Sequence, residues 1–206
     1  MTTIFLGMGL LLLTLAGFSL FSMKAPKGSA AMSGLANAAV ATFLVVLMGF
    51  LLGGIIKMIC TSPLSSMALT AMLGLTGLPM GIAAIACFGG SFTNGIIFAQ
   101  LKLGKPSNIA AVMLEPLTQA HIITRHPIPI YGSNFFGGGL AGIAAALLGI
   151  VNNAPGTASP IPGLLAPFAF NPPVKVLIAL ALGAVGGTLA GFAGSIVFKK
   201  FTQDEA

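Results

Sequence analysis

The sequence predicts an all-α polytopic membrane protein. Only 6% of its 206 residues are charged and 56% are hydrophobic, and the mean hydropathy is +1.04. In a soluble domain about a quarter of the residues are charged, so water is excluded as the main solvent of this chain. The apolar residues form long runs, and helices are the simplest structure that satisfies the backbone inside lipid. We therefore expect one transmembrane domain, residues 1–206, built from about five spanning helices and two re-entrant hairpins.

Five apolar runs are long enough to cross a bilayer as helices, which takes about 20 residues. They are residues 4–23, 37–58, 78–101, 132–151 and 174–198. The first run lacks the basic start of a signal peptide, so we expect a retained helix there. Cys60 and Cys87 lie in apolar runs without redox or metal-ligand spacing, and we expect no such role for them.

Two further apolar segments, 61–77 and 152–173, are broken by proline, glycine and hydroxyl residues. Neither is polar enough for a solvent loop or regular enough for a full span. Non-helical backbone at membrane depth is tolerated only where it is buried in protein or lines a wet cavity. We interpret both segments as re-entrant hairpins, and the alternative is that either one crosses the membrane.

The cations orient this topology, because cytoplasmic loops carry an excess of lysine and arginine. With the N-terminus outside and the C-terminus inside, only Lys57 and Lys175 fall outside. The net charge of +6 follows the ends of the apolar runs, so we ascribe it to topology and lipid headgroups and expect no nucleic-acid partner. The cations on the cytoplasmic side are then Lys24, Lys27, Lys102, Lys105, Arg125, Lys199 and Lys200.

An internal repeat is one interpretation of the pattern. Residues 62–64 and 159–161 share a Ser-Pro start, and the same offset places 89–91 on 186–188. Each repeat, 30–101 and 132–200, would be a span, a hairpin and a span, joined by the cytoplasmic segment 102–131. A separate glycine pattern in the last span recurs every four residues and predicts a close-packing face rather than a ligand site: Gly183, Gly187 and Gly191.

Glu115 is the only acidic residue before the C-terminal tail, and both histidines, His121 and His126, lie in the same segment. An ionisable group in an apolar setting marks a candidate functional site. A carboxylate, an imidazole and the amide of Gln119 suit the hydroxyls of a sugar, and Glu115 and His121 are the predicted ligands. The alternative is a cytoplasmic loop in which Glu115 pairs with Arg125. The spacing fits no metal site, and no cofactor is expected.

Two other polar clusters could bind a polar solute. Residues 152–160 read NNAPGTASP, and Asn152, Asn153, Gly156, Thr157 and Ser159 are candidate ligands, with an ordinary extracellular loop as the alternative. Asn94 interrupts the third span, where a hydrogen bond between helices is the commoner role. The sequence has no Walker loop, Rossmann fingerprint or Ser/His/Asp arrangement, and no catalytic residues of its own are evident.

Three motifs resemble one family. Residues 61–66 and 72–77 (TSPLSS and MLGLTG) resemble T-x-P-I-S-S and M-L-G-L-S-G, residues 123–127 (ITRHP) resemble I-V-R-N-P, and residues 152–156 (NNAPG) resemble N-N-P-x-G. These patterns belong to a branch of the enzyme IIC membrane subunits of the bacterial sugar phosphotransferase system that includes proposed toxin-regulator membrane proteins. The family members are longer than this chain.

The resemblance implies a sugar-binding permease subunit in the bacterial cell membrane that works with separate IIA and IIB proteins, and we expect a homodimer because the chain is small for a complete pathway. The cytoplasmic segment would face the phosphate-donating partner through its basic residues. Two alternatives stay open: a non-transporting sensor or regulator on the same scaffold, and a stand-alone channel or facilitator for a small solute. The predicted partner-facing residues are Lys102, Lys105, Arg125 and His126.

Overall fold

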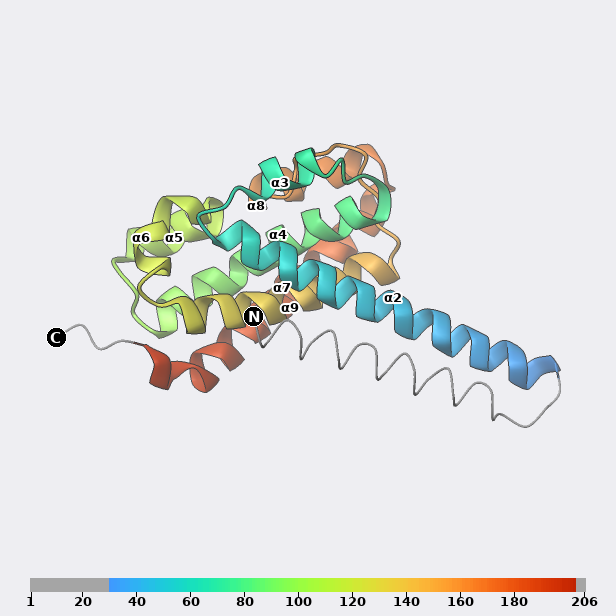
Figure 1. Ribbon diagram of the computed structural model, residues 1–206, viewed down its shortest axis with the longest axis horizontal. Coiled ribbons are helices and arrows are strands. Elements are labelled where there is room, and N and C mark those ends of the chain that lie inside the picture. Colours follow the sequence, from blue (N-terminus) through green and yellow to red (C-terminus); the bar gives the residue numbers. More distant parts are fainter. Residues whose placement is uncertain (1–29, 203–206) are drawn as a thin grey trace. The chain divides into compact units, whose positions relative to one another are not determined.

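The computed structural model describes residues 30–202, and every regular element among them is a helix (Figure 1). The predicted first span, residues 4–23, lies outside the described residues. The chain divides into two compact units, Met1–Phe43 and Leu44–Ala206, and the packing described below belongs to the second. The elements are α2 (Ala30–Thr61), α3 (Ser66–Met72), α4 (Gly77–Gln100), α5 (Pro106–Leu114), η1 (Pro116–Gln119), α6 (Ala120–Ile123), α7 (Pro127–Leu147), α8 (Pro160–Leu165), η2 (Ala166–Ala169), α9 (Pro173–Val197) and η3 (Lys199–Phe201).

Four of these helices are long and apolar enough to cross a membrane: Ala36–Thr61, Gly77–Gln100, Pro127–Leu147 and Pro173–Val197. They confirm the prediction of an all-α multi-pass membrane protein, and they match the last four predicted runs within a few residues. Proline stands at the first position of α5, α7, α8 and α9. Because proline lacks an N–H that the first turn does not need, it begins a helix well, which explains why α7 starts earlier than hydropathy predicted.

Close backbone approaches define the direction of each spanning helix. Gly49 and then Gly53 on α2 meet residues progressively nearer the start of α7, so α2 and α7 are antiparallel. The same order relates α4 to α7, whereas α4 and α9 advance together and are parallel. Therefore α2, α4 and α9 run in one direction and α7 in the other. The pairs are Gly49–Gly142, Gly53–Gly138, Gly89–Ala141, Gly137–Thr93, Gly89–Gly183 and Gly191–Ile96.

The parallel arrangement of α2 and α4 corrects one prediction. Segment 61–77 starts at the end of α2 and must return along the bundle to reach the start of α4, as Figure 1 shows. It therefore crosses back, and its interpretation as a re-entrant hairpin is wrong. A sequence broken by Pro63 and by Gly74, whose φ is +58°, can cross because other segments pair with its polar groups, as described below.

Segment 148–172 behaves differently, because it joins the antiparallel helices α7 and α9. Its two ends lie at the same end of the bundle, where Lys175 Nζ donates to Gly149 O at 3.3 Å. A re-entrant hairpin requires this geometry, and its depth in the bilayer stays a prediction. The internal repeat also stays a prediction. The helix directions do not support it, because the first helices of the two predicted repeats, α2 and α7, run in opposite directions.

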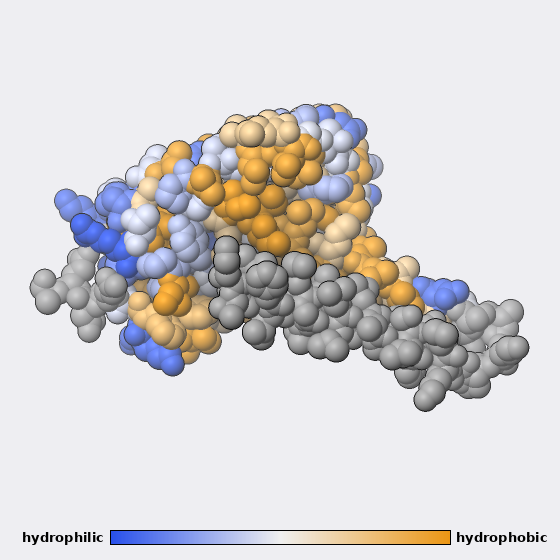
Figure 2. All heavy atoms as spheres, viewed as in Figure 1, coloured by the Kyte–Doolittle hydropathy of each residue, from blue (hydrophilic) through white to orange (hydrophobic). Residues whose placement is uncertain are grey.

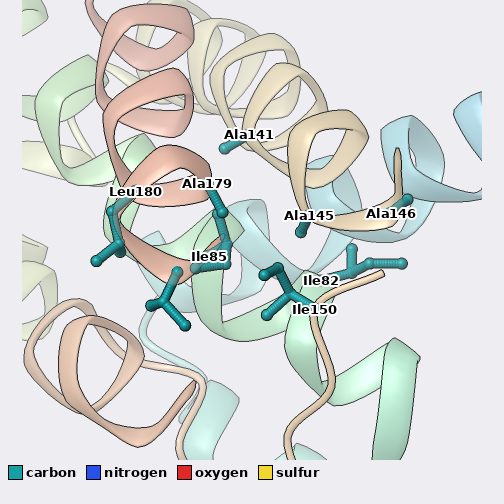
Figure 3. Packing of buried hydrophobic residues seen from close by; sticks show 9 residues of the cluster. Ile82, Ile85, Ala141, Ala145, Ala146, Ile150, Ala179 and Leu180 are labelled. Carbon is teal, nitrogen blue, oxygen red and sulfur yellow. The ribbon is translucent and has the colours of Figure 1, made fainter. Parts of the chain in front are cut away.

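The largest core lies between α4, α7 and α9 (Figure 3). Isoleucines of α4, Ile82 and Ile85, fill the space left by the small residues Ala141 and Ala145 of α7. The predicted packing role of the glycines on α9 is confirmed: a side chain at Gly187 would clash with the carbonyl oxygen of Gly89. Close packing of small residues is the usual way in which membrane helices associate.

The outer surface separates into apolar and polar regions (Figure 2). Hydrophobic residues of α9 point outwards, and Ile196 is 78% exposed, as expected of a lipid-facing side. Hydrophilic residues gather over α5, α6 and η3 at the left of the view. That end carries most of the described cations.

Candidate functional site

Lys57 is the most unusual residue of the bundle. It lies inside the spanning part of α2 and is fully buried, whereas the predicted topology put it at the outer end of the run 37–58. Its stem passes between α4 and α7 at two glycines: a Cβ on Gly90 would lie 2.5 Å from its Cδ, and a Cβ on Gly138 would clash with its Cβ. The ammonium donates to the carbonyl of Cys87 at 3.4 Å, a long and weak hydrogen bond.

The next turn holds three more buried polar side chains, and together with Lys57 we call them the polar cluster. Thr61 lies one helical turn after Lys57 on α2, and Asn94 lies one turn after Gly90 on α4. Asn134 lies one turn before Gly138, because α7 runs in the opposite direction. All three side chains are fully buried. Asn134 Nδ2 donates to Asn94 Oδ1 at 2.6 Å and to Ile130 O at 2.8 Å. The hydrogen bond between helices predicted as the alternative role of Asn94 is therefore present.

This cluster is only partly satisfied. Thr61 Oγ1, Asn94 Nδ2 and Asn134 Oδ1 are buried and have no hydrogen-bond partner. Leaving a buried polar atom unpaired costs about 1–3 kcal/mol, and such groups are rare in folded proteins. A hydroxyl, an amide donor and an amide acceptor beside an ammonium match the hydroxyl groups of a polyol, each of which both donates and accepts.

Glu115 lies at the join between α5 and η1 and is exposed. Its backbone organises the join, because its carbonyl accepts from Thr118 Oγ1 at 2.8 Å. The carboxylate makes no ion pair with Arg125, which was the alternative predicted for it.

The two broken segments, 61–77 and 148–172, meet beside the buried cysteines Cys60 and Cys87. Ser66 Oγ of α3 donates to Ala158 O at 2.5 Å. Ala158, Cys60 and Cys87 share one core cluster. Segment 61–77 therefore finds its polar partner in segment 148–172, which explains how non-helical backbone is accommodated next to spanning helices.

The predicted asparagine ligands have structural partners at the far end of this junction. Asn152 N–H donates to Gly77 O at 2.9 Å, and Gly77 N–H donates to Asn153 Oδ1 at 3.0 Å. The Asn152 amide donates to Thr157 Oγ1 at 2.8 Å and accepts from Ala154 N–H at 2.9 Å. Folding alone accounts for these side chains, and their role as sugar ligands stays a prediction.

Gly156 and Ser159 also have structural roles. Gly156 has φ +77°, a turn conformation that side chains rarely adopt. Ser159 is buried directly before α8. Neither is aimed at the polar cluster by any contact that the structure records.

The connecting segment forms a separate cavity of about 580 Å³. It brings together all of the predicted partner-facing residues and His121, but Glu115 does not line it, so this pocket does not pair Glu115 with His121. The wall is held by Asn108, which donates to Gln119 Oε1 at 2.5 Å and accepts from Lys105 N–H at 2.7 Å. The charged and polar residues that line it include Lys102, Lys105, His121, Arg125, His126 and Thr202.

Comparison with known proteins decides the family. The family model described as "Phosphotransferase system, EIIC" matches residues 46–205, which is more than half of the chain. The chain belongs to the phosphotransferase system EIIC family. Neither the curated proteins nor the solved structures contain a match to it.

The family confirms the resemblance drawn from the three motifs. This EIIC chain is a multi-pass membrane subunit of the phosphotransferase type of sugar transport. The matched region begins within α2 and includes Lys57, the rest of the polar cluster, Glu115 and the basic cavity. Both candidate sites therefore lie in the part of the EIIC chain that defines the family.

Sequence reasoning missed Lys57, Thr61 and Asn134 of the EIIC chain. A signal for Lys57 was present, since it is the one cation between positions 28 and 101 and follows nearly twenty apolar or small residues. Asn134 stands in the run Gly132–Gly139 without any neighbouring charge, and only the packing of α7 against α4 shows its partner. No cluster that could hold a metal occurs among the described residues.

Proposed function

We propose that this chain is the sugar-translocating subunit of a phosphotransferase system and that its sugar site is the polar cluster, with Glu115 as a further ligand. The single observation that carries this proposal is the buried Lys57 beside three unpartnered polar atoms. An ionisable residue inside a membrane bundle is costly and marks function by default. In an EIIC chain the expected function of such a site is to bind sugar.

The residues of the cluster offer complementary hydrogen bonds. Asn94 Nδ2 donates to a sugar oxygen, Asn134 Oδ1 accepts from a sugar hydroxyl, and Thr61 can do either. The Lys57 ammonium has three donors, and its one recorded acceptor is distant. Glu115 adds an exposed carboxylate, which accepts hydrogen bonds from sugar hydroxyls.

The broken segments provide the moving parts in this proposal. Transporters commonly place substrate sites near helices that are interrupted in the membrane. Segments 61–77 and 148–172 meet at the hydrogen bond between Ser66 and Ala158, beside the thiol of Cys60. Separation of the two segments at this contact would open a path to the cluster, and closure would shield the sugar from water.

The distribution of cations predicts which end of the bundle faces the cytoplasm. The end of the bundle where α4 and α9 finish carries Lys102, Lys105, Arg125, Lys199 and Lys200, whereas the other end of the second unit carries Lys175. The positive-inside rule then puts the C-terminus in the cytoplasm of a bacterial cell. The basic cavity faces the same compartment, where IIA- and IIB-like proteins act, and we assign His121 to this face rather than to the sugar. A homodimer is part of the proposal, since the chain is small for a complete pathway.

A thermal-shift titration of the purified protein with a panel of sugars tests the site. A ligand that binds only the native state stabilises it by about 2.7 kcal/mol at one hundred times its Kd, so the transported sugar raises Tm. Asn94→Leu removes the unpartnered donor and leaves Asn134 its bond to Ile130, and we expect it to raise the sugar Kd at least about tenfold. Ser195→Ala is the matched control, because that buried hydroxyl donates to Phe192 O of its own helix at 2.7 Å.

Two outcomes would contradict the proposal. If Asn94→Leu binds the sugar as tightly as the Ser195→Ala control, the polar cluster is not the site. If liposomes that contain only this chain pass unmodified sugar at the rate seen with the IIA and IIB proteins and their phosphate donor, the chain is a facilitator. Transport by group translocation requires that the internal product is the sugar phosphate and that it forms only with the soluble proteins present.

A further inference from the structure

The basic cavity of the connecting segment has the features of an anion site. Lys102, Lys105 and Arg125 line it together with both histidines of the protein. No carboxylate belongs to its wall among the described residues. Its volume of about 580 Å³ is in the range of small-molecule sites.

Two polar atoms in the wall are buried without a partner. His126 is 4% exposed, and its Nδ1 makes no hydrogen bond. Thr202 Oγ1, which comes from the other end of the chain, is in the same condition. His126 and Thr202 therefore line the same cavity, and neither His126 Nδ1 nor Thr202 Oγ1 has a hydrogen-bond partner in the protein. Both atoms are available to a ligand.

The backbone presents one of the cations in a strained conformation. Helix α4 ends in a motif in which Leu103 N–H donates back to Phe98 O at 2.9 Å, and the residue between the helix end and Leu103 adopts φ > 0. That position favours glycine, but here it is Lys102, with φ 54°. Strain of this kind gathers at ligand sites, where the side chain has a function that offsets it.

We propose that this cavity binds the phosphate group of a small phosphate monoester. A dianion with three acceptor oxygens needs several positive donors at different angles, and lysine, arginine and histidine supply them. The first turn of α5 adds its positive end, because Ser107 and Asn108 also line the cavity.

The same phosphate chemistry occurs in two sources, a soluble sugar phosphate and the headgroup of phosphatidic acid. The first experiment measures binding of inorganic phosphate and of glucose 6-phosphate to the purified full chain by calorimetry, with glucose as the neutral reference. The second measures Tm in nanodiscs with and without phosphatidic acid. Binding of glucose 6-phosphate but not glucose supports the soluble source, stabilisation by phosphatidic acid alone supports the lipid source, and the absence of both overturns the proposal.

Lys102→Gly is the decisive variant, because it separates binding from folding. Glycine relieves the strain at φ 54°, so Tm stays equal or rises, while the affinity for the phosphate ligand falls about tenfold through loss of one charged hydrogen bond. Lys199→Gln is the matched control, since Lys199 lies at the same end and does not line the cavity. Equal loss of affinity in both variants would show non-specific surface charge and overturn the site.

Two further variants test the unpartnered nitrogen of His126 and the acidic C-terminal residues. His126→Phe keeps the ring and removes the nitrogen, and we expect a comparable loss of affinity. A chain that ends at Thr202 lacks Asp204 and Glu205, the acidic residues that follow the cavity in sequence. Retained or stronger phosphate binding by this chain supports the proposal, and its loss contradicts it. Sugar binding at the polar cluster is unchanged in Lys102→Gly, so failure of this proposal and failure of the sugar site are distinguishable.

Discussion

Replacement of Lys57 by methionine should stabilise this protein and abolish its sugar binding. Methionine has nearly the length of the lysine stem and is flexible enough to occupy the same passage between Gly90 and Gly138. The substitution therefore removes the charge with little change of volume. The two expected effects have opposite signs, which makes the prediction specific to a functional charge.

The expected magnitude follows from what surrounds the ammonium. A lysine at the centre of a spanning helix costs about 2.5–3.5 kcal/mol relative to an apolar residue on insertion scales. A good hydrogen bond from a charged donor returns about 1.5–3 kcal/mol, but the contact with Cys87 O is 3.4 Å long and lies at the weak end. The net gain for Lys57→Met is then about 1–2 kcal/mol. For a chain of this size that corresponds to a rise in Tm of about 2–8 °C.

Thermal unfolding in a mild detergent measures the first effect, and a sugar titration of the same preparation measures the second. Lys175→Met is the control, because Lys175 is only half-buried, donates to Gly149 O at 3.3 Å and should change stability by less than about 0.5 kcal/mol. If Lys57→Met lowers Tm, the ammonium is better satisfied than its single contact indicates. If the variant binds sugar like the wild type, Lys57 is not part of the site.

Three further predictions concern other parts of the structure. Glu115→Gln keeps the shape of an exposed side chain, so Tm should not change, while the sugar Kd rises about tenfold in the thermal-shift titration if the carboxylate is a ligand. Asn171→Ala removes three hydrogen bonds within segment 148–172, two with Val151 at 3.0 and 2.7 Å and one to Pro167 O at 2.7 Å, and should destabilise by about 2–4 kcal/mol in thermal unfolding; a loss below about 1 kcal/mol would mean that solvent replaces them. Gly53→Leu should prevent folding, judged by loss of a monodisperse peak in size-exclusion chromatography, because its side chain would enter the Gly138 carbonyl of α7, whereas Gly34→Leu on the same helix has open space and should fold.

The spanning helices could be predicted from the sequence because their length and apolar composition are local properties. The run 78–101 became α4 (Gly77–Gln100), and 174–198 became α9 (Pro173–Val197). The glycines of α9 were also predictable, since small residues at a spacing of four leave one face of a helix free for a neighbouring backbone. These signals need no knowledge of what lies beside the helix.

The course of segment 61–77 could not be predicted for the opposite reason. Its composition suits a hairpin and a broken crossing equally well, and the choice depends on whether α4 packs parallel or antiparallel to α2. That choice is made by contacts such as Gly53 with Gly138, which are distant in sequence. Topology based on charge inherits the same weakness, because every segment beyond a crossing changes sides.

The candidate site shows a similar limit. Asn94 was recognisable as a polar residue in a span, but its partner Asn134 and the unpartnered atoms of both become visible only when α4 and α7 are placed together. Asn152 and Thr157 looked like ligands because polar residues in an apolar run suggest a solute. In the structure they form hydrogen bonds with each other and with the adjacent backbone, as turn residues commonly do, so their presence in the turn is explained without a solute.

The glycines beside Lys57 show how the bundle makes room for a buried charge. Most helical glycines of the bundle allow one backbone to approach another, as at Gly142 and Gly49, and alanine would obstruct them. Gly90 instead faces a side chain, as Gly95, Gly132 and Gly137 also do, and here the nearest atoms to the missing Cβ are Cγ, Cδ and Cε of the charged Lys57. The space at Gly90 therefore belongs to the lysine and not to helix packing. A bundle selected for stability alone would fill that space with two apolar side chains, so the passage that encloses a charge indicates that the charge itself has a function.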